Sequence, residues 1–188
     1  MKKEDHRIRL TRLLLKETII ELLREFHISK ITVKMLCERA NISRSTFYTH
    51  YDNPFDLLNQ LESEIYQVLQ EIFSSQETLQ TITKNLLDYV VKNKNIFQVL
   101  LSKNGSAQFM EKMMKLAQEI REENCDRPTN SQLRIYIHRF TVTGTISVLQ
   151  LWLENDMPET TEYMAELVIN LIKKGEDYVT SNGIENTP

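Results

Sequence analysis

A short polar run near the amino terminus carries side chains that can hydrogen-bond to base edges and to phosphates. Its members are Arg44, Ser45, Thr46, Tyr48, Thr49 and His50. Arginine can donate two hydrogen bonds to guanine, and small hydroxyl side chains let a helix approach the floor of a groove. The N–H groups at helix starts near Thr32 and Ser43 suit phosphate oxygens. This set of residues therefore predicts contact with the major groove of duplex DNA.

Two short helices joined by a tight turn are expected to position these side chains. Apolar residues recur at helical spacing over residues 33–40, directly after Thr32, which is a good N-cap residue. Asn41 tolerates the left-handed geometry of a helix end, and Ser43 can cap a second helix that starts at residue 44. The positions expected to pack inward are Leu36, Ala40 and Ile42. This is the form of a helix-turn-helix, with the second helix offered to DNA.

The rest of the chain also shows helical periodicity, which predicts an all-α fold of about nine helices. A first helix is expected over residues 9–26. The clearest start signal is Asn53 as N-cap with Pro54 at the first helical position, and it opens a long helix over residues 54–73. Further helices are expected over about 79–92, 96–101, 109–120, 131–154 and 160–180.

The helix expected over residues 131–154 is apolar on two nearly opposite sides. One stripe consists of Leu133, Ile137, Phe140, Gly144, Val148 and Leu151, and the other of Ile135, Val142, Ile146, Leu149 and Leu153. A helix that is apolar on two faces needs cover on both. One face is expected to pack in its own domain and the other against a partner subunit, which predicts a homodimer through the last two helices, about 131–154 and 160–180.

Charge and composition exclude several classes of protein. Residues 1–52 hold eleven Lys and Arg against seven acids, whereas the remainder holds twelve against nineteen, so a basic head precedes an acidic body. A basic head can approach phosphates. Four glycines and four prolines argue against a collagen-like or low-complexity chain. No apolar run approaches the roughly 20 residues that span a bilayer, so a cytoplasmic location without membrane association is expected.

The motif residues closely resemble the DNA-binding domain of the TetR/AcrR family of bacterial transcriptional regulators, over about residues 8–60. The matching positions are Thr32, Leu36 to Ala40, Ile42, Ser43, Thr46 to Tyr48, His50, Tyr51, Leu57 and Leu58. The resemblance implies that Arg44, Ser45 and Thr49 face bases. It also implies that Thr32, Tyr48 and His50 contact phosphates, and that the body binds a small effector.

Two positions depart from the family pattern. Asn41 stands where the family usually has glycine, which is an easily tolerated change. The family also has a lysine near Asn53, and its loss removes one expected phosphate contact. In the body, Arg134 to Phe140, Gly144 and residues 151–153 resemble a TetR subgroup that includes regulators of dihydroxyacetone kinase operons.

Candidate ligand-binding residues in the body are Tyr89, Phe97, Phe109, His138, Arg139, Phe140 and Trp152. Aromatic residues at helical spacing are more often plain core, so both interpretations stay open for each. Arg139 beside His138 would suit an anionic ligand or an ion pair at a dimer surface.

Cofactor, metal and enzyme chemistry find little support. Cys37 lies on an inward stripe and is expected to be core packing, and Cys125 sits beside acids that disfavour a reactive thiolate. The four histidines are scattered, without the spacing of metal ligands. Catalytic and phosphate-cradling motifs such as GxGxxG, GxSxG and HExxH are absent, so no cofactor and no enzyme activity are expected.

These observations predict a DNA-binding head over 1–52 and a regulatory and dimerisation body over 53–188. The expected protein is a homodimeric regulator that binds a palindromic operator in double-stranded DNA and is released or reset by a small-molecule effector. The alternative is a regulator whose body binds a partner protein instead of a metabolite.

Overall fold

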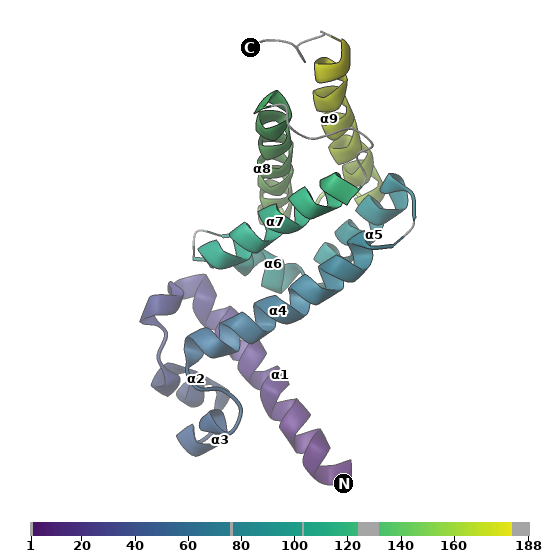
Figure 1. Cartoon of the computed structure of the whole chain (residues 1–188). Coiled ribbons are helices and arrows are strands. Elements are labelled where there is room, and N and C mark those ends of the chain that lie inside the picture. Colours follow the sequence, from purple (N-terminus) through teal and green to yellow (C-terminus); the bar gives the residue numbers. More distant parts are fainter. Residues whose placement is uncertain (1, 76, 103, 124–131, 182–188) are drawn as a thin grey trace. The chain divides into compact units, whose positions relative to one another are not determined.

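The computed structural model describes residues 2–75, 77–102, 104–123 and 132–181, and all regular elements in these ranges are helical (Figure 1). The helices are α1 Lys2–Glu25, η1 Ile28–Lys30, α2 Val33–Ala40, α3 Arg44–Tyr48, α4 Pro54–Phe73, α5 Leu79–Lys92, α6 Lys94–Leu100, α7 Ala107–Glu123, α8 Gln132–Glu154 and α9 Thr161–Ser181. The all-α fold with nine α-helices over these residues confirms the expectation. Among the described helices, none has the length and apolar character needed to cross a membrane.

Local capping explains why the predicted helix ends are so close to the observed ones. Asn53 Oδ1 accepts a hydrogen bond from the Asp56 N–H at 3.0 Å, so α4 begins at Pro54 as the sequence indicated. Thr78 Oγ1 accepts from the Thr81 N–H at 3.2 Å and starts α5 in the same way. The largest difference is at α1, which begins at Lys2 and not near residue 9. Residues 6–10 of this helix are exposed, so apolar periodicity gave no sign of its first turns.

The chain divides into two compact units whose bounds differ from the expected head and body. Unit 1 consists of Met1–Gln67 and Val99–Phe109, and unit 2 of Val68–Gln98 and Met110–Pro188. The segment after α6 joins unit 1 through tertiary contacts: Phe109 is fully buried, and Asn104 Nδ2 donates to the Leu23 carbonyl at 3.2 Å. The functional boundary between residues 52 and 53 stays a prediction, because contact density alone does not define a function.

The core of unit 1 forms around the apolar stripe of α1. The fully buried side chains of this core include Leu15, Ile19, Leu22, Leu23, Leu36, Phe47 and Leu57. In this unit α1 packs against α2, and α2 packs against α3. Ion pairs join the same elements at the surface, from Arg39 on α2 to Glu25 on α1 and from Lys16 on α1 to Glu64 on α4. The short helices α2 and α3 are therefore fixed by packing, because helices of this length are not stable alone.

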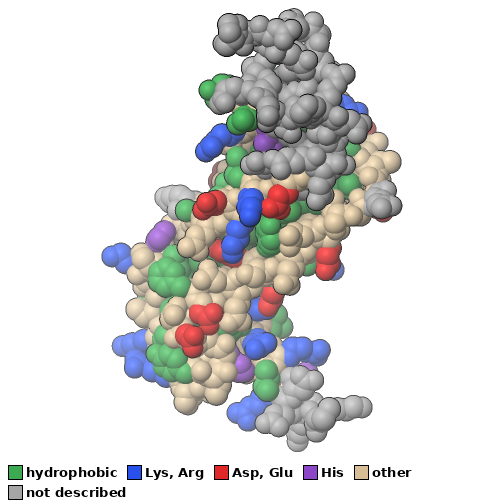
Figure 2. Space-filling view, viewed as in Figure 1, with side chains coloured by type: hydrophobic (Ala, Val, Ile, Leu, Met, Phe, Trp, Pro, Cys, Tyr) green, Lys and Arg blue, Asp and Glu red, His purple; other side chains and the backbone are tan. Residues whose placement is uncertain are grey.

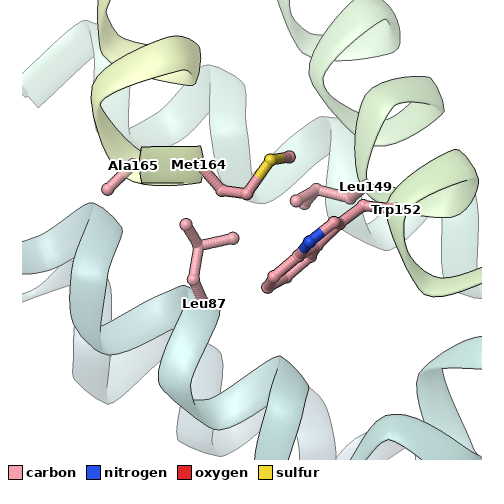
Figure 3. Packing of buried hydrophobic residues seen from close by; sticks show 5 residues of the cluster. All are labelled: Leu87, Leu149, Trp152, Met164 and Ala165. Carbon is pink, nitrogen blue, oxygen red and sulfur yellow. The ribbon is translucent and has the colours of Figure 1, made fainter. Parts of the chain in front are cut away.

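The core of unit 2 lies between α5, α8 and α9 (Figure 3). Leu87 from α5, Leu149 and Trp152 from α8, and Met164 and Ala165 from α9 converge in one cluster. Helix α9 packs against both α5 and α8. A polar link adds to this packing, because Lys84 on α5 pairs with Asp88 at 2.7 Å and with Glu162 on α9 at 3.3 Å.

Helix α8 has the two different apolar faces that the sequence predicted. Leu149 and Leu153 are buried, whereas Phe140 exposes 77% and Leu151 59% of their surface. Val148, which the sequence analysis placed on the same stripe as Phe140 and Leu151, packs partly against the core cluster. This difference arises because Val148 precedes Leu149 by one residue and so lies only about 100° around the helix from it.

Candidate nucleic-acid interface

The two-helix motif is built by capping at each of its bends. Thr32 Oγ1 accepts from the Met35 N–H at 3.3 Å and starts α2. Asn41 ends α2 with φ 51° and ψ 48°, the left-handed conformation that the sequence indicated. Ser43 Oγ accepts from the Thr46 N–H at 3.1 Å and starts α3. Both N-caps and the Asn41 C-cap confirm the expected local structure.

Helix α3 separates a buried side from a side that faces solvent. Phe47 is fully buried, and Tyr51, just beyond the helix, exposes only 2% of its surface. The exposed side chains on and beside α3 are Ser43, Arg44, Ser45, Tyr48 and Thr49, while Thr46 and His50 are half-buried. Apart from Thr32 at the start of α2, the candidate DNA-binding residues thus lie on one short segment. Its buried side is anchored by aromatic rings.

Tyr48 is the most prominent apolar group on this surface, with 58% of its surface exposed. Its ring stands edge-on to Phe47, with centroids 5.6 Å apart and planes at 85°. A buried neighbour therefore orients the phenol while its hydroxyl remains free to reach solvent. That arrangement suits a donor to a phosphate oxygen.

The hydroxyl groups at the start of α3 hydrogen-bond to one another in the free protein. Ser43 Oγ lies 2.7 Å from Ser45 Oγ and 2.8 Å from Thr46 Oγ1. Thr49 Oγ1 donates to the Thr46 carbonyl at 2.5 Å. Ser43 and Thr46 are thus engaged in capping, which gives them a structural role alongside any contact with DNA. Arg44 at the same helix start is exposed.

An arginine that the sequence analysis passed over acts on the end of the motif. The charge of Arg12 on α1 reaches both His50 and Tyr51. Partial burial, and secondarily the Arg12 charge, lower the pKa of His50 below its usual 6.5. Burial raises the pKa of Tyr51, while Arg12 opposes that rise. The available sequence signal was the shared helical face of Arg9, Arg12 and Lys16 at spacings of three and four residues.

A shallow hollow of about 450 Å³ lies beside the turn. Its lining consists of Lys34, Cys37, Glu38, Asn41, Ile42 and Arg44. Cys37 itself is 6% exposed, and burial raises the pKa of its thiol, which disfavours the reactive thiolate. Its position agrees with the expected packing role. Cys125 lies outside the described residues.

The start of α4 differs from the family pattern in a way that matters for phosphates. The carboxylate of Asp56 accepts a hydrogen bond from the Asp52 N–H at 3.0 Å, and Phe55 exposes half of its surface. Two acids and an aromatic ring therefore occupy the region where the resemblance implies a lysine. Carboxylates repel phosphates, so the cationic contacts of this head must come from other elements.

The structure does not bring all the candidate ligand-binding residues together. Phe97 and Trp152 are buried in unit 2, and Tyr89 packs edge-on against Phe97 with centroids 5.8 Å apart. Phe109 belongs to unit 1, whereas Phe140 is largely exposed. The other two candidates are His138, half-buried, and Arg139, exposed. Among the described residues, His, Cys, Asp and Glu side chains form no cluster of three that would hold a metal ion.

A helix-turn-helix with a polar outer surface, followed by a helical body, defines a class of transcriptional regulators. A family model described as the transcriptional regulator C-terminal region, TetR_C_8, matches residues 77–174, more than half of the chain. The chain therefore belongs to the TetR family of transcriptional regulators. This family consists of regulators and not of enzymes, in agreement with the lack of catalytic motifs.

Individual relatives support the same assignment. The uncharacterized HTH-type transcriptional regulator YxbF of Bacillus subtilis (strain 168) is 23% identical over 172 residues, which cover 87% of this chain and 45% of the relative. The chain thus spans less than half the length of that curated relative. A TetR transcriptional regulator from Streptococcus agalactiae 2603V has a similar structure, with a TM-score of 0.65 and 25% identity over 90% of this chain and 97% of its own.

The dihydroxyacetone kinase operon activator DhaS also has a similar structure. Its TM-score is 0.59 at 18% identity, covering 89% of this chain and 97% of the DhaS chain. At this identity the likeness shows a shared fold alone. The resemblance to that subgroup therefore stays a prediction.

Proposed function

We propose that the chain is a homodimeric transcriptional regulator that binds a palindromic operator in duplex DNA through α2 and α3. Arg44, Ser45 and Thr49 read base edges, while Thr32, Tyr48 and His50 bind phosphates. Ser43 and Thr46 hold the start of α3 and offer their hydroxyls to the same surface. Such a protein acts in the cytoplasm of its cell, where the chromosome lies.

One observation carries the proposal: the geometry of α3. Phe47 and Tyr51 anchor its inner side, so Arg44, Ser45, Tyr48 and Thr49 are held together on the solvent side. A short recognition helix must present a few polar side chains rigidly, because each well-placed bidentate contact contributes about 1–3 kcal/mol of discrimination between bases. Membership of the TetR family supports the same role.

A second copy of the chain is the expected cover for the outer face of α8. Its exposed side chains recur at one-face spacing and are Tyr136, Phe140, Thr143, Ser147 and Leu151. Between them lies Gly144, where an added Cβ would meet open space in the single chain. Two heads related by a two-fold axis would place their α3 helices about 34 Å apart, in successive major grooves.

The effector is proposed to bind in the body and to favour one arrangement of the two heads. Phe97 and Trp152 are candidate contacts that unit 2 buries, and Tyr89 is half-buried beside Phe97. The candidates nearer the surface are His138, Arg139 and Phe140. Phe109 is a candidate from the start of α7. Helix α4 runs without a break from residues of unit 1 into residues of unit 2. It is therefore the candidate element for transmitting the effect of ligand binding to the DNA-binding head. The ligand can shift the equilibrium only by its difference in affinity for the two states.

Selection of bound duplexes from a random library tests the DNA-binding function. The wild type is expected to enrich a sequence with two-fold symmetry at moderate salt. Tyr48→Ala and His50→Ala are expected to weaken binding to all sequences, whereas Arg44→Ala also relaxes the preferred base at one position per half-site. Lys92→Ala removes an exposed charge from α5 and serves as the control. Absence of any enriched sequence would refute the proposal.

A second candidate is a body that binds a partner protein. The observation in its favour is the exposure of Phe140 and Arg139, which places two candidate ligand contacts on the surface. Thermal unfolding with a panel of metabolites separates the two candidates, because a ligand that binds only the folded state raises the unfolding temperature. A specific rise supports the effector, and its absence across the panel favours the protein partner.

A further inference from the structure

The amino-terminal half of α1 carries basic side chains that the motif itself does not use. Arg9, Arg12 and Lys16 are spaced by three and four residues, so they share one face of the helix. This half of α1 continues past α3 (Figure 1). Its apolar residues Ile8 and Leu10 are exposed, so it adds little to the core of unit 1.

The orientation of this face is fixed by its last member. Lys16 pairs with Glu64, which turns the face toward α4. One turn earlier, the charge of Arg12 acts on Tyr51 and His50, the residues that follow α3. Arg9 lies a further 4.5 Å or so along the axis, at 1.5 Å per residue. The face therefore continues the candidate DNA surface beyond the carboxyl end of α3.

Arg9 and Arg12 make no ion pair with any side chain that the structure describes. Lys16, Lys34 and Arg39 in the same unit each pair with a carboxylate. In the part of the chain that the structure describes, Arg9 and Arg12 form no such pair, and both are exposed. Lys and Arg side chains are prominent over unit 1 in Figure 2. Burial, and secondarily the charge of Arg12, lower the pKa of His50, and a cation at this place raises the local affinity for an anion.

We propose that Arg9 and Arg12 form a second phosphate-binding surface, which binds the duplex backbone outside the segment that α3 reads. The inference rests on the proposed DNA-binding function and adds a ligand contact to it. The surface takes over the role of the lysine missing near Asn53, where two acids stand instead. Its contacts carry no base information, so they raise the affinity for all duplexes and fix the position of the head.

The test uses the full-length protein and the operator enriched by the selection described above. Binding is measured by fluorescence anisotropy between 50 and 200 mM salt for the wild type and for the double variant Arg9→Ala, Arg12→Ala. The affinity falls as salt rises, and each phosphate contact adds about 0.9 to the magnitude of the slope of log affinity against log salt. A dimer that loses four such contacts should therefore show a slope that is smaller in magnitude by about 3 to 4. The base preference is expected to stay that of the wild type.

Arg7→Ala provides the matched control, because Arg7 is an exposed arginine on the same half of α1 but on another face. It is expected to change the slope by less than half as much as Arg12→Ala. Alanine favours helix, so circular dichroism is expected to show the helix content of the wild type in both variants. If Arg7→Ala and Arg12→Ala change the salt slope equally, the DNA contact is not confined to the face of Arg9 and Arg12, and the inference fails.

Flanking DNA provides a second readout. The wild type is expected to lose affinity when the base pairs outside the enriched sequence are trimmed, and the double variant to become insensitive to trimming. If the double variant keeps the salt slope and the trimming response of the wild type, the inference fails while the proposed function stands. If the wild type itself enriches no sequence, the proposed function fails instead.

A membrane surface is the competing partner for a basic helix with exposed leucines. Sedimentation with vesicles containing about 30% phosphatidylserine addresses it. Loss of vesicle binding in the double variant, together with wild-type DNA binding, would overturn the inference. Wild-type protein that stays in the supernatant supports the DNA assignment.

Discussion

Phe47 and Tyr48 are adjacent in sequence and serve opposite purposes. A step of one residue rotates the side chain by about 100° around a helix, so Phe47 enters the core while Tyr48 points to solvent. Phe47 is fully buried and Tyr48 is 58% exposed. Phe47 fixes the position of α3, and Tyr48 is thereby held at the surface where it is proposed to bind a phosphate. Stability and DNA affinity should therefore respond separately to changes at these two sites.

Phe47→Ala is expected to lower the free energy of unfolding by about 3–5 kcal/mol, because it leaves a large cavity in the core of unit 1. Tyr48→Ala is expected to change it by no more than about 0.5 kcal/mol while weakening DNA binding. Urea unfolding followed by circular dichroism measures the first quantity, and anisotropy the second. Comparable destabilisation by both substitutions would contradict the assigned roles.

His50, a proposed phosphate contact, is expected to make DNA binding sensitive to pH. Burial and the Arg12 charge lower the pKa of His50 in the free protein below 6.5, so the ring is neutral there at pH 7. A bound phosphate favours the charged ring and raises this pKa, so binding takes up protons. DNA affinity is therefore expected to rise as the pH falls from the pKa of the complex toward that of the free protein.

His50→Gln should remove that part of the pH dependence, and the wild type measured over the same pH range serves as the reference. The effect of His50 on folding stability has the opposite pH dependence to its effect on DNA affinity. The unfolded chain binds this proton more readily, so the contribution of His50 to stability is lost as the pH falls below 6.5. In nuclear magnetic resonance titrations, Arg12→Ala should raise the pKa of His50, and an unchanged pKa would disprove the electrostatic contact.

At the scale of elements, the turn between α2 and α3 depends on one backbone conformation. Asn41 has φ 51°, and its N–H bonds to the carbonyls of Cys37 and Glu38. Asparagine tolerates this region better than most residues but less well than glycine, which has no Cβ. The turn therefore keeps its geometry at a small energetic cost.

Asn41→Gly is expected to stabilise the protein by up to about 1 kcal/mol, and Asn41→Ala to destabilise it by about 1 kcal/mol. Both changes in the free energy of unfolding can be measured from the midpoints of urea unfolding curves. DNA affinity should stay unchanged in the glycine variant, since the angle between α2 and α3 is preserved. A glycine variant less stable than the alanine variant would show that the left-handed conformation is not what the turn requires.

At the scale of the whole molecule, the proposed dimer uses the exposed face of α8, and its two-fold symmetry would match a symmetric operator. Phe140 and Leu151 are exposed on a helix whose other side is buried through Leu149 and Leu153. Large apolar side chains that recur on one exposed face are typical of an interface. A two-fold interface uses the same patch on both copies, so one substitution acts twice.

Phe140→Glu is expected to shift the protein to monomer and to reduce operator affinity at least tenfold, because it places two like charges in the interface. Sedimentation velocity gives the oligomeric state. A wild type that remains monomeric at micromolar concentration, or a footprint without two-fold symmetry, would contradict this arrangement.

Sequence patterns alone predicted most helix bounds, the caps and the two-helix motif, because these depend on contacts within a few residues; the first turns of α1 were missed. Thr32, Asn41, Ser43 and Asn53 occupy the positions that their side-chain chemistry predicted. Tertiary packing, in contrast, brings the charge of Arg12 within reach of His50, places Phe109 in unit 1 and leaves Phe140 exposed. These facts depend on how helices distant in sequence pack together, and periodicity within one helix carries no information about its neighbours.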